Sequence, residues 1–198
     1  MSYKWIPNFL TSSRIFLVPI FLYFLFSEFS HAKLFALIIF IIASITDALD
    51  GKIARKHNTV SKFGIFLDPL ADKILTLSAF YAFMYIPTLS TTVKLWMILL
   101  ISFRDIVVTT LRTILQYKGI TMITSKLGKI KTALQLATIH LILISLIIQS
   151  YSITEPINIA YDKSLYFLMV ITSIITFYTG VHYFLYNYKT LGSLIFKK

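Results

Sequence analysis

The 198-residue sequence contains no cysteine and very few acidic side chains. The lack of cysteine excludes disulfide bonds, thiolate catalysis and zinc–thiolate sites. Only eight residues are Asp or Glu, against 19 Lys and Arg, so the formal net charge is +11. Internal repeats, low-complexity segments and Gly- or Pro-rich linkers are also missing. We therefore expect a single domain covering residues 1–198.

The sequence is unusually rich in apolar residues. They make up 57% of the chain, and the mean hydropathy is +0.79, too high for an average soluble domain. The basic residues lie between apolar runs rather than along one soluble face. Their expected partners are therefore the anionic lipid headgroups of a bilayer and phosphorylated substrates, and no nucleic acid.

Six apolar stretches approach the roughly 20 residues that a helix needs to cross a bilayer. They lie near residues 11–27, 33–55, 66–86, 93–117, 130–150 and 163–187. Residues 3–10, which include Tyr3 and Trp5, predict a short helix at the membrane interface. The fold class predicted is an all-α integral membrane protein, with six transmembrane helices preceded by a short interfacial N-terminal helix.

The charges between these stretches predict the orientation in the membrane. Lys and Arg gather after the second and fourth stretches and in the C-terminal tail, whereas Glu28, Glu155 and Asp162 lie in the alternate connections. By the positive-inside rule, both termini and the basic loops are cytoplasmic. The first residues lack the features of a signal peptide, and we expect a bacterial inner membrane with the active site facing the cytoplasm.

Half of the acidic residues lie within one short stretch. Asp47 and Asp50 are spaced i, i+3, and Asp68 and Asp72 are spaced i, i+4, so each pair lies on one face of a helix. Carboxylates near hydrocarbon are costly, and four together would repel one another without cations. Mg²⁺ or Mn²⁺ suits such an all-oxygen site. Solvated loop charges or helix caps would be the alternative, but two pairs at helical spacing favour a metal site.

Small residues accompany the aspartates. Gly51, Ala54 and Gly64 fall on the same helical faces and leave room for a flat ligand or for close backbone approach. Arg55, at the rim, has the planar guanidinium that binds phosphate through two parallel hydrogen bonds.

These positions together resemble a family signature. The pattern Asp-x₂-Asp-Gly-x₂-Ala-Arg-x₈-Gly-x₃-Asp-x₃-Asp, running from Asp47 to Asp72, is similar to that of the CDP-alcohol phosphotransferases, and every defined position is filled. The resemblance implies that a hydroxyl attacks the phosphate of a CDP-linked donor and that CMP leaves. It also implies that Asp47, Asp50 and Asp68 hold two metal ions, with Asp72 at their edge and acting as general base. Residues that would border the CDP group are Gly51, Ala54, Arg55 and Gly64.

A basic set lies in the second half of the chain. Asp105, Thr109 and Arg112 share one helical stripe beside Arg104, and Lys129 and Lys131 open the next apolar stretch. These cations exceed what Asp105 can neutralise, so an external anion such as a phosphate is expected. Two simpler interpretations stay open: Arg104 can pair with Asp105 or with a carboxylate of the metal site, and Lys131 can extend to the headgroups.

This set resembles the phosphatidylglycerophosphate synthase branch of the family, although the usual pattern has Glu at the position of Asp105. The resemblance implies CDP-diacylglycerol as donor and sn-glycerol 3-phosphate as acceptor. Asn8 and Arg14, in the N-terminal pattern Pro-Asn-Phe-Leu-Thr-x₂-Arg, would lie near the donor phosphates. The residues implied to bind the acceptor phosphate are Arg104, Thr109, Arg112, Lys129 and Lys131.

Other functions stay open at this point. A sister transferase could use inositol phosphate, serine or phosphatidylglycerol as acceptor, and inositol phosphate would equally explain the basic residues. A divalent-cation transporter could use the aspartates as an ion site, but such folds often show repeats and broken helices, which this sequence lacks. The family resemblance also suggests a homodimer.

Overall fold

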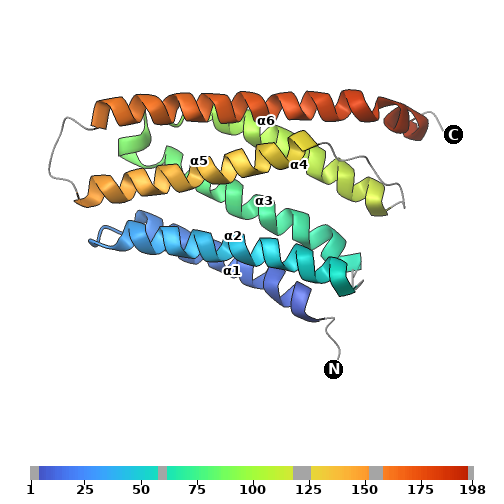
Figure 1. Ribbon diagram of the computed structural model, residues 1–198, viewed down its shortest axis with the longest axis horizontal. Coiled ribbons are helices and arrows are strands. Elements are labelled where there is room, and N and C mark those ends of the chain that lie inside the picture. Colours follow the sequence, from blue (N-terminus) through green and yellow to red (C-terminus); the bar gives the residue numbers. More distant parts are fainter. Residues whose placement is uncertain (1–4, 58–61, 118–125, 152–157, 196–198) are drawn as a thin grey trace.

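The computed structural model describes residues 5–57, 62–117, 126–151 and 158–195. Inside the helices, it leaves undescribed the side chains of residues 5–12, 47–57, 62–69, 72, 117, 126, 158–161 and 189–195. Within the described ranges, six α-helices and one short 3₁₀ helix, η1, form the fold (Figure 1). Their bounds are α1 Trp5–Phe26, α2 Ala32–His57, α3 Lys62–Met84, η1 Pro87–Leu89, α4 Leu95–Tyr117, α5 Lys126–Tyr151 and α6 Asn158–Ile195. The predicted all-α fold is confirmed.

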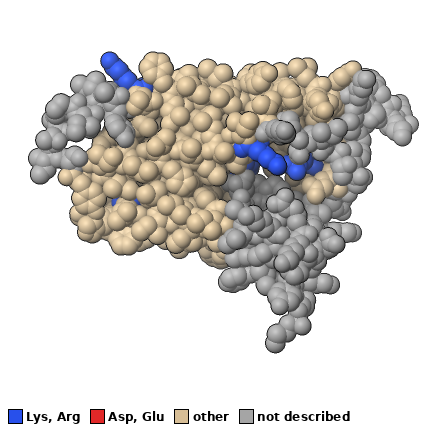
Figure 2. Space-filling model, viewed as in Figure 1, with Lys and Arg blue, Asp and Glu red and all other residues tan. Residues whose placement is uncertain are grey.

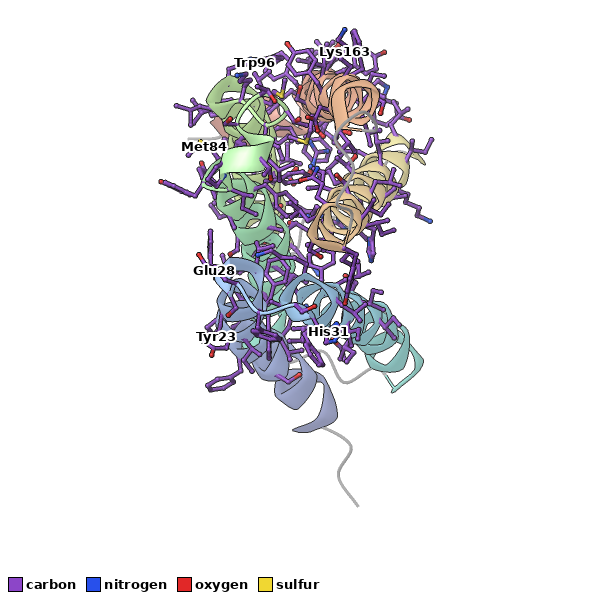
Figure 3. All side chains as sticks on the ribbon, turned by 90° about the vertical axis from the view of Figure 1, so that its left-hand side faces the viewer. Tyr23, Glu28, His31, Met84, Trp96 and Lys163 are labelled. Atoms are coloured by element: carbon purple, nitrogen blue, oxygen red, sulfur yellow. The ribbon has the colours of Figure 1, made fainter. Side chains whose placement is uncertain are left out.

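The helices run up and down between two ends of an elongated bundle (Figure 1). Helices α1, α3 and α5 finish, and α2, α4 and α6 start, at the left of that view. Figure 3 looks onto this end, where Glu28, His31, Met84, Trp96 and Lys163 lie. We call it the Glu28 end. The opposite, aspartate end is where α2 finishes and α3 starts, and both chain termini lie toward it (Figure 1).

A continuous apolar core fills the half of the bundle nearer the Glu28 end. Phe21 of α1 packs against Phe40 of α2, with ring centroids 5.5 Å apart. Both side chains are fully buried, as are Phe83 of α3 and Ile98 of α4. Each helix contributes the turns nearest this end, so the core is built from the ends of α1, α3 and α5 and the starts of α2, α4 and α6.

The half nearer the aspartate end buries polar side chains instead. On α6, Thr172, Thr176, Thr179 and Tyr183 follow one another at helical spacing and are all buried. They form an inward-facing stripe against α4 and α5, which both contact α6. Small hydroxyl side chains allow close helix approach and hydrogen bonding between helices in a membrane. Packing in this half is therefore tight and polar.

The outer surface is strongly apolar. Phe16, Leu99, Phe103, Phe167 and Leu185 are among many large hydrophobic side chains that are more than half exposed. The described part of the face in Figure 2 is accordingly almost entirely uncharged, apart from a few Lys and Arg side chains. Two stretches, Leu127–Tyr151 and Asp162–Tyr188, are long and apolar enough by themselves to cross a membrane. Shorter apolar segments of the described residues are Ser13–Phe26, Ala32–Thr46 and Lys73–Met84.

One predicted element is wrong. Residues 5–10 are not a separate interfacial helix, because α1 continues without a break from Trp5 to Phe26. Pro7 does not interrupt it because it lies in the first turn, where backbone N–H groups have no helical partner anyway. At the other terminus, α6 extends to Ile195, beyond the predicted span at 163–187.

Candidate active site

The acidic signature lies on α2 and α3, of which the first finishes and the second starts at the aspartate end (Figure 1). Asp47 and Asp50 belong to α2, and Asp68 and Asp72 belong to α3, so both pairs have the helical spacing that places each on one face. The two helices run in opposite directions, and α1 contacts both (Figure 1). A set of four carboxylates has the all-oxygen chemistry that hard divalent cations prefer. The residues therefore fit such ions by their chemistry.

The side chains of the signature lie outside the described part of the structure. They belong to Asp47, Asp50, Gly51, Ala54 and Arg55 on α2 and to Gly64, Asp68 and Asp72 on α3. Among the side chains that are described, no group of three or more His, Cys, Asp or Glu residues forms. That the four carboxylates converge on metal ions stays a prediction.

The structure shows a buried ion cluster centred on Asp105 of α4. It includes Lys73 of α3, the residue after Asp72. The Lys131 Nζ of α5 donates to Asp105 Oδ1 at 2.6 Å, and Arg104 Nη1 donates to the same oxygen at 3.1 Å. The second oxygen, Oδ2, lies 3.8 Å from Lys73 Nζ of α3. Asp105 is 0% exposed and Lys131 only 1%. One carboxylate thus connects three helices.

The cluster extends to α6 through a fourth polar partner. Gln135, one turn after Lys131 on α5, donates through Nε2 to Asp105 Oδ2 at 3.3 Å and is also 3.3 Å from Thr176 Oγ1. Arg104 also contacts α6, because an ideal Cβ built on Gly180 would lie only 2.6 Å from Arg104 Cγ. We call Lys73, Arg104, Asp105, Lys131 and Gln135 the Asp105 cluster.

The sequence profile of one family, CDP-alcohol phosphatidyltransferase, matches residues 4–184. This chain belongs to that family. The matched region includes every predicted site residue, from Asn8 to Lys131. Members are membrane-embedded transferases of phospholipid synthesis that use divalent metal ions, so the chain is a membrane protein of this class.

Relatives with assigned names agree on one branch of the family. A CDP-diacylglycerol–glycerol-3-phosphate 3-phosphatidyltransferase of Bacillus subtilis is 38% identical over 151 residues, covering 70% of this chain and 76% of that protein. The enzyme of the same name from Wigglesworthia glossinidia brevipalpis is 33% identical and covers 94% of this chain and 96% of its own. A probable phosphatidylglycerophosphate synthase of Mycobacterium tuberculosis is 32% identical, with 96% and 84% covered.

For this CDP-alcohol phosphatidyltransferase, the predicted acceptor residues divide into two groups. Arg104 and Lys131 lie inside the Asp105 cluster, whereas Arg112 and Lys129 have exposed side chains and Thr109 is partly buried. The alternative that Arg104 pairs with Asp105 is what the structure shows. The alternative that Lys131 extends to the headgroups is wrong, because its side chain is buried against Asp105.

Of the two predicted donor-binding residues on α1, the structure describes the side chain of Arg14 only. Arg14 is only 1% exposed, which fits a charged group held inside the bundle rather than one facing lipid. Asn8 lies in the second turn of α1, and its side chain is outside the described part. Their role at the donor phosphates stays a prediction.

Sequence reasoning missed three members of this arrangement. Lys73 directly follows Asp72, Gln135 lies four residues after Lys131, and Gly180 is one of two glycines in a long apolar helix. Helical spacing from Lys131 could have indicated Gln135, because a polar side chain in a membrane helix rarely faces lipid. Gly180 gave no such signal, since its contact with Arg104 depends on how α4 and α6 pack.

The cluster carries a surplus of positive charge. Among the described side chains within it, Lys73, Arg104 and Lys131 contribute three cations against the one carboxylate of Asp105. In Figure 2, basic side chains gather near the start of α5, next to the undescribed residues. A buried surplus of this kind attracts an anion, and a phosphate monoester supplies up to two negative charges.

Proposed function

We propose that this chain transfers the phosphatidyl group from CDP-diacylglycerol to sn-glycerol 3-phosphate, giving phosphatidylglycerol phosphate and CMP. Relatives that carry the corresponding name cover up to 96% of the chain, and this is the main support. The observation that carries the acceptor choice is the Asp105 cluster, in which two largely buried cations, Arg104 and Lys131, share one oxygen of a single carboxylate. A phosphorylated acceptor neutralises that surplus, whereas serine or glycerol would not.

At the aspartate end, Asp47, Asp50 and Asp68 would hold two divalent ions, Mg²⁺ or Mn²⁺, with Asp72 at their edge. Bound there, the ions would neutralise the pyrophosphate and stabilise CMP as it leaves. Asp72 would accept the proton of the acceptor hydroxyl as that oxygen attacks the phosphatidyl phosphate. Support comes from the helical spacing of both pairs on α2 and α3.

The donor head group would rest against the small residues of the same two helices. Gly51, Ala54 and Gly64 leave space for the cytidine group, and Arg55, Asn8 and Arg14 would bind its phosphates. The burial of Arg14, which is only 1% exposed, supports this assignment because it places a charged side chain inside the bundle rather than against lipid. The acyl chains would stay in the surrounding bilayer.

On the acceptor side, Arg104, Thr109, Arg112, Lys129 and Lys131 would surround the phosphate of glycerol 3-phosphate. Lys73 connects this set to α3, the helix that carries Asp68 and Asp72. It follows Asp72 in the chain, and its Nζ lies 3.8 Å from Asp105 Oδ2. The acceptor hydroxyl can then be held near Asp72 while its phosphate is held by the cations.

We further propose that all six helices of the single domain at 1–198 cross the bilayer. The alternation of helix ends between the Glu28 end and the aspartate end supports this (Figure 1). The acidic residues of the outer connections support an orientation with the Glu28 end outside and the active site at the cytoplasmic side, in a bacterial inner membrane. Association into a homodimer is a further expectation from the family.

The test is CMP release by purified protein with CDP-diacylglycerol and Mg²⁺. Glycerol 3-phosphate, inositol phosphate, serine and phosphatidylglycerol are compared as acceptors, and a chelator is the metal control. Release with glycerol 3-phosphate alone, lost on chelation and restored by Mg²⁺ or Mn²⁺, supports the proposal. Release with inositol phosphate alone would identify a sister transferase. No CMP release with any acceptor, from folded protein, would contradict the proposed transferase activity.

A further inference from the structure

Arg104 lies against a position of α6 that has no side chain. A Cβ on Gly180 would lie 2.6 Å from Arg104 Cγ, 3.6 Å from its Cβ and 3.8 Å from its Cδ. Real carbon atoms do not approach so closely, so the two residues are compatible only because position 180 is glycine. The atoms concerned are at the root of the Arg104 side chain and not at its flexible tip. Relief of the clash would therefore require a different rotamer or a shift between α4 and α6.

The present rotamer of Arg104 brings its guanidinium to Asp105. Nη1 donates to Oδ1 at 3.1 Å, and the Arg104 side chain is only 10% exposed. Its Nε is buried and has no hydrogen-bond partner among the described residues. Because an unsatisfied buried donor on a cation is costly, this N–H is available to a ligand that enters the cluster.

Asp105 is in turn held by Gln135. The amide Nε2 donates to Asp105 Oδ2 at 3.3 Å and lies the same distance from Thr176 Oγ1 on α6. Gln135 is 0% exposed, and its Oε1 has no hydrogen-bond partner within the described part of the chain. The amide therefore fixes Asp105 between α4 and α6 and leaves a second unsatisfied polar atom beside the same cluster.

We propose that Gly180 and Gln135 are positioning residues for the acceptor phosphate: Gly180 admits the rotamer of Arg104, and Gln135 fixes the carboxylate that orients Arg104 and Lys131. This inference rests on the proposed function, because it presumes that a phosphorylated acceptor binds at the cluster. It adds two residues that contact no substrate and that act through Arg104 and Asp105. Loss of either should weaken acceptor binding and leave donor binding unchanged, since no predicted donor residue lies on α5 or α6.

The first experiment compares Gly180→Ala with Val181→Leu. Val181 is the next residue on α6 and is 43% exposed, so the added methylene of the control points away from the cluster. We expect Gly180→Ala to raise the KM for glycerol 3-phosphate about tenfold, the scale of one lost charged hydrogen bond. The KM for CDP-diacylglycerol should stay within about twofold, and Val181→Leu should change neither. Ala also has the higher helix propensity, so a weaker helix would not explain a loss.

A second pair of variants tests Gln135. Gln135→Met keeps the length of the side chain and removes both hydrogen bonds, while Gln149→Met makes the same change on α5 at the Glu28 end. Gln149 donates to Ser145, outside the cluster, and serves as the matched control. We expect Gln135→Met to raise the acceptor KM about tenfold. Gln149→Met should leave both KM values unchanged.

Inorganic phosphate supplies a measure of binding, its inhibition constant, that does not depend on the value of kcat. As a competitive inhibitor against glycerol 3-phosphate, it should bind Gly180→Ala and Gln135→Met more weakly, by the same factor as the rise in KM. A purely structural defect would lower kcat, or the amount of folded protein, without this parallel change. If Gly180→Ala does not fold, as judged by size-exclusion chromatography in detergent, the Gln135 pair decides alone.

The outcomes separate this inference from the proposed function. Unchanged acceptor KM in folded Gly180→Ala and Gln135→Met, with wild-type protein active on glycerol 3-phosphate, would overturn the positioning roles only. Equal increases in donor and acceptor KM would also overturn them, because the effect would then not be specific to the acceptor. A wild-type protein inactive with every phosphorylated acceptor would instead overturn the proposed function.

Discussion

The two halves of the bundle use the same helices for opposite purposes. Toward the Glu28 end, α5 buries Ile139, Leu143 and Leu146 against an apolar core. In the turns before Ile139, the same inward face of α5 carries Lys131 and Gln135, both almost fully buried. The apolar half can be changed at a cost in packing alone, whereas the polar half holds charges that need partners.

This contrast indicates which half of the bundle serves function and which half serves stability. Burying Asp105 among cations is costly, and such a cluster stabilises a membrane protein poorly compared with apolar packing. The cluster lies next to the proposed base, because its member Lys73 directly follows Asp72 in the chain. Its position is therefore better explained by function than by stability. The apolar half would serve as the rigid support that keeps α3, α4 and α5 in register.

The largest effect is expected at Asp72 in the polar half. Asp72→Asn removes the proposed base and keeps the size of the side chain, so kcat should fall by about 10²- to 10⁴-fold. Donor binding and thermal stability should stay near wild type. The measurement is CMP release beside a CDP-diacylglycerol binding assay, and full activity of the variant would exclude Asp72 as the base.

Asp105→Ala should come next, because it leaves Lys73, Arg104 and Lys131 without their shared carboxylate. Removal of one partner from a buried ion cluster costs about 3–5 kcal/mol. We expect a clear loss of thermal stability in detergent together with lost activity. Asp105→Glu is the control, since it keeps the charge, and it should retain most of the stability; equal instability of both variants would point to packing rather than charge.

In the apolar half, Phe83→Ala should affect stability and not substrate binding. Phe83 is 0% exposed, and truncation of a buried Phe typically costs about 3–5 kcal/mol. We expect a lower thermal unfolding midpoint and, in the protein that stays folded, unchanged KM for both substrates. A selective rise in acceptor KM would show that the two halves are not separable in the way described.

The smallest effect is expected at Arg112, whose side chain is exposed. Arg112→Ala should raise the acceptor KM about tenfold and leave stability unchanged, because only a contact with phosphate is lost. The same assay on Arg112→Lys tests whether charge alone suffices or the planar guanidinium is needed. An unchanged acceptor KM in Arg112→Ala would remove this residue from the acceptor site.

Sequence reasoning succeeded where short-range periodicity carries the information. The helical spacing of Asp47 with Asp50 and of Asp68 with Asp72 follows from the chain alone, and the structure places both pairs within helices. It failed at the start of α1, where Tyr3 and Trp5 indicated an interfacial helix. An unbroken helix satisfies most of its own backbone groups, and α1 continues past Pro19, a residue that membrane helices tolerate.

The partners of Asp105 were only partly predictable. Arg104 is its neighbour in the chain, so an ion pair between them could be considered from the sequence. Lys73 and Gln135, by contrast, are 32 and 30 residues away and on different helices. The spacing of residues along each helix does not indicate which faces of α3, α4 and α5 pack against one another.

By itself the sequence determined the class of this protein: an apolar all-α chain whose few acidic residues stand at helical spacing in a family signature. Those features are local, because helix formation and membrane preference depend on residues a few positions apart. Only the tertiary structure decided that Asp105 joins Lys73, Arg104, Lys131 and Gln135, and that Gly180 makes room for Arg104. Such contacts depend on the rotation and separation of packed helices, which are set by the packing of the whole bundle.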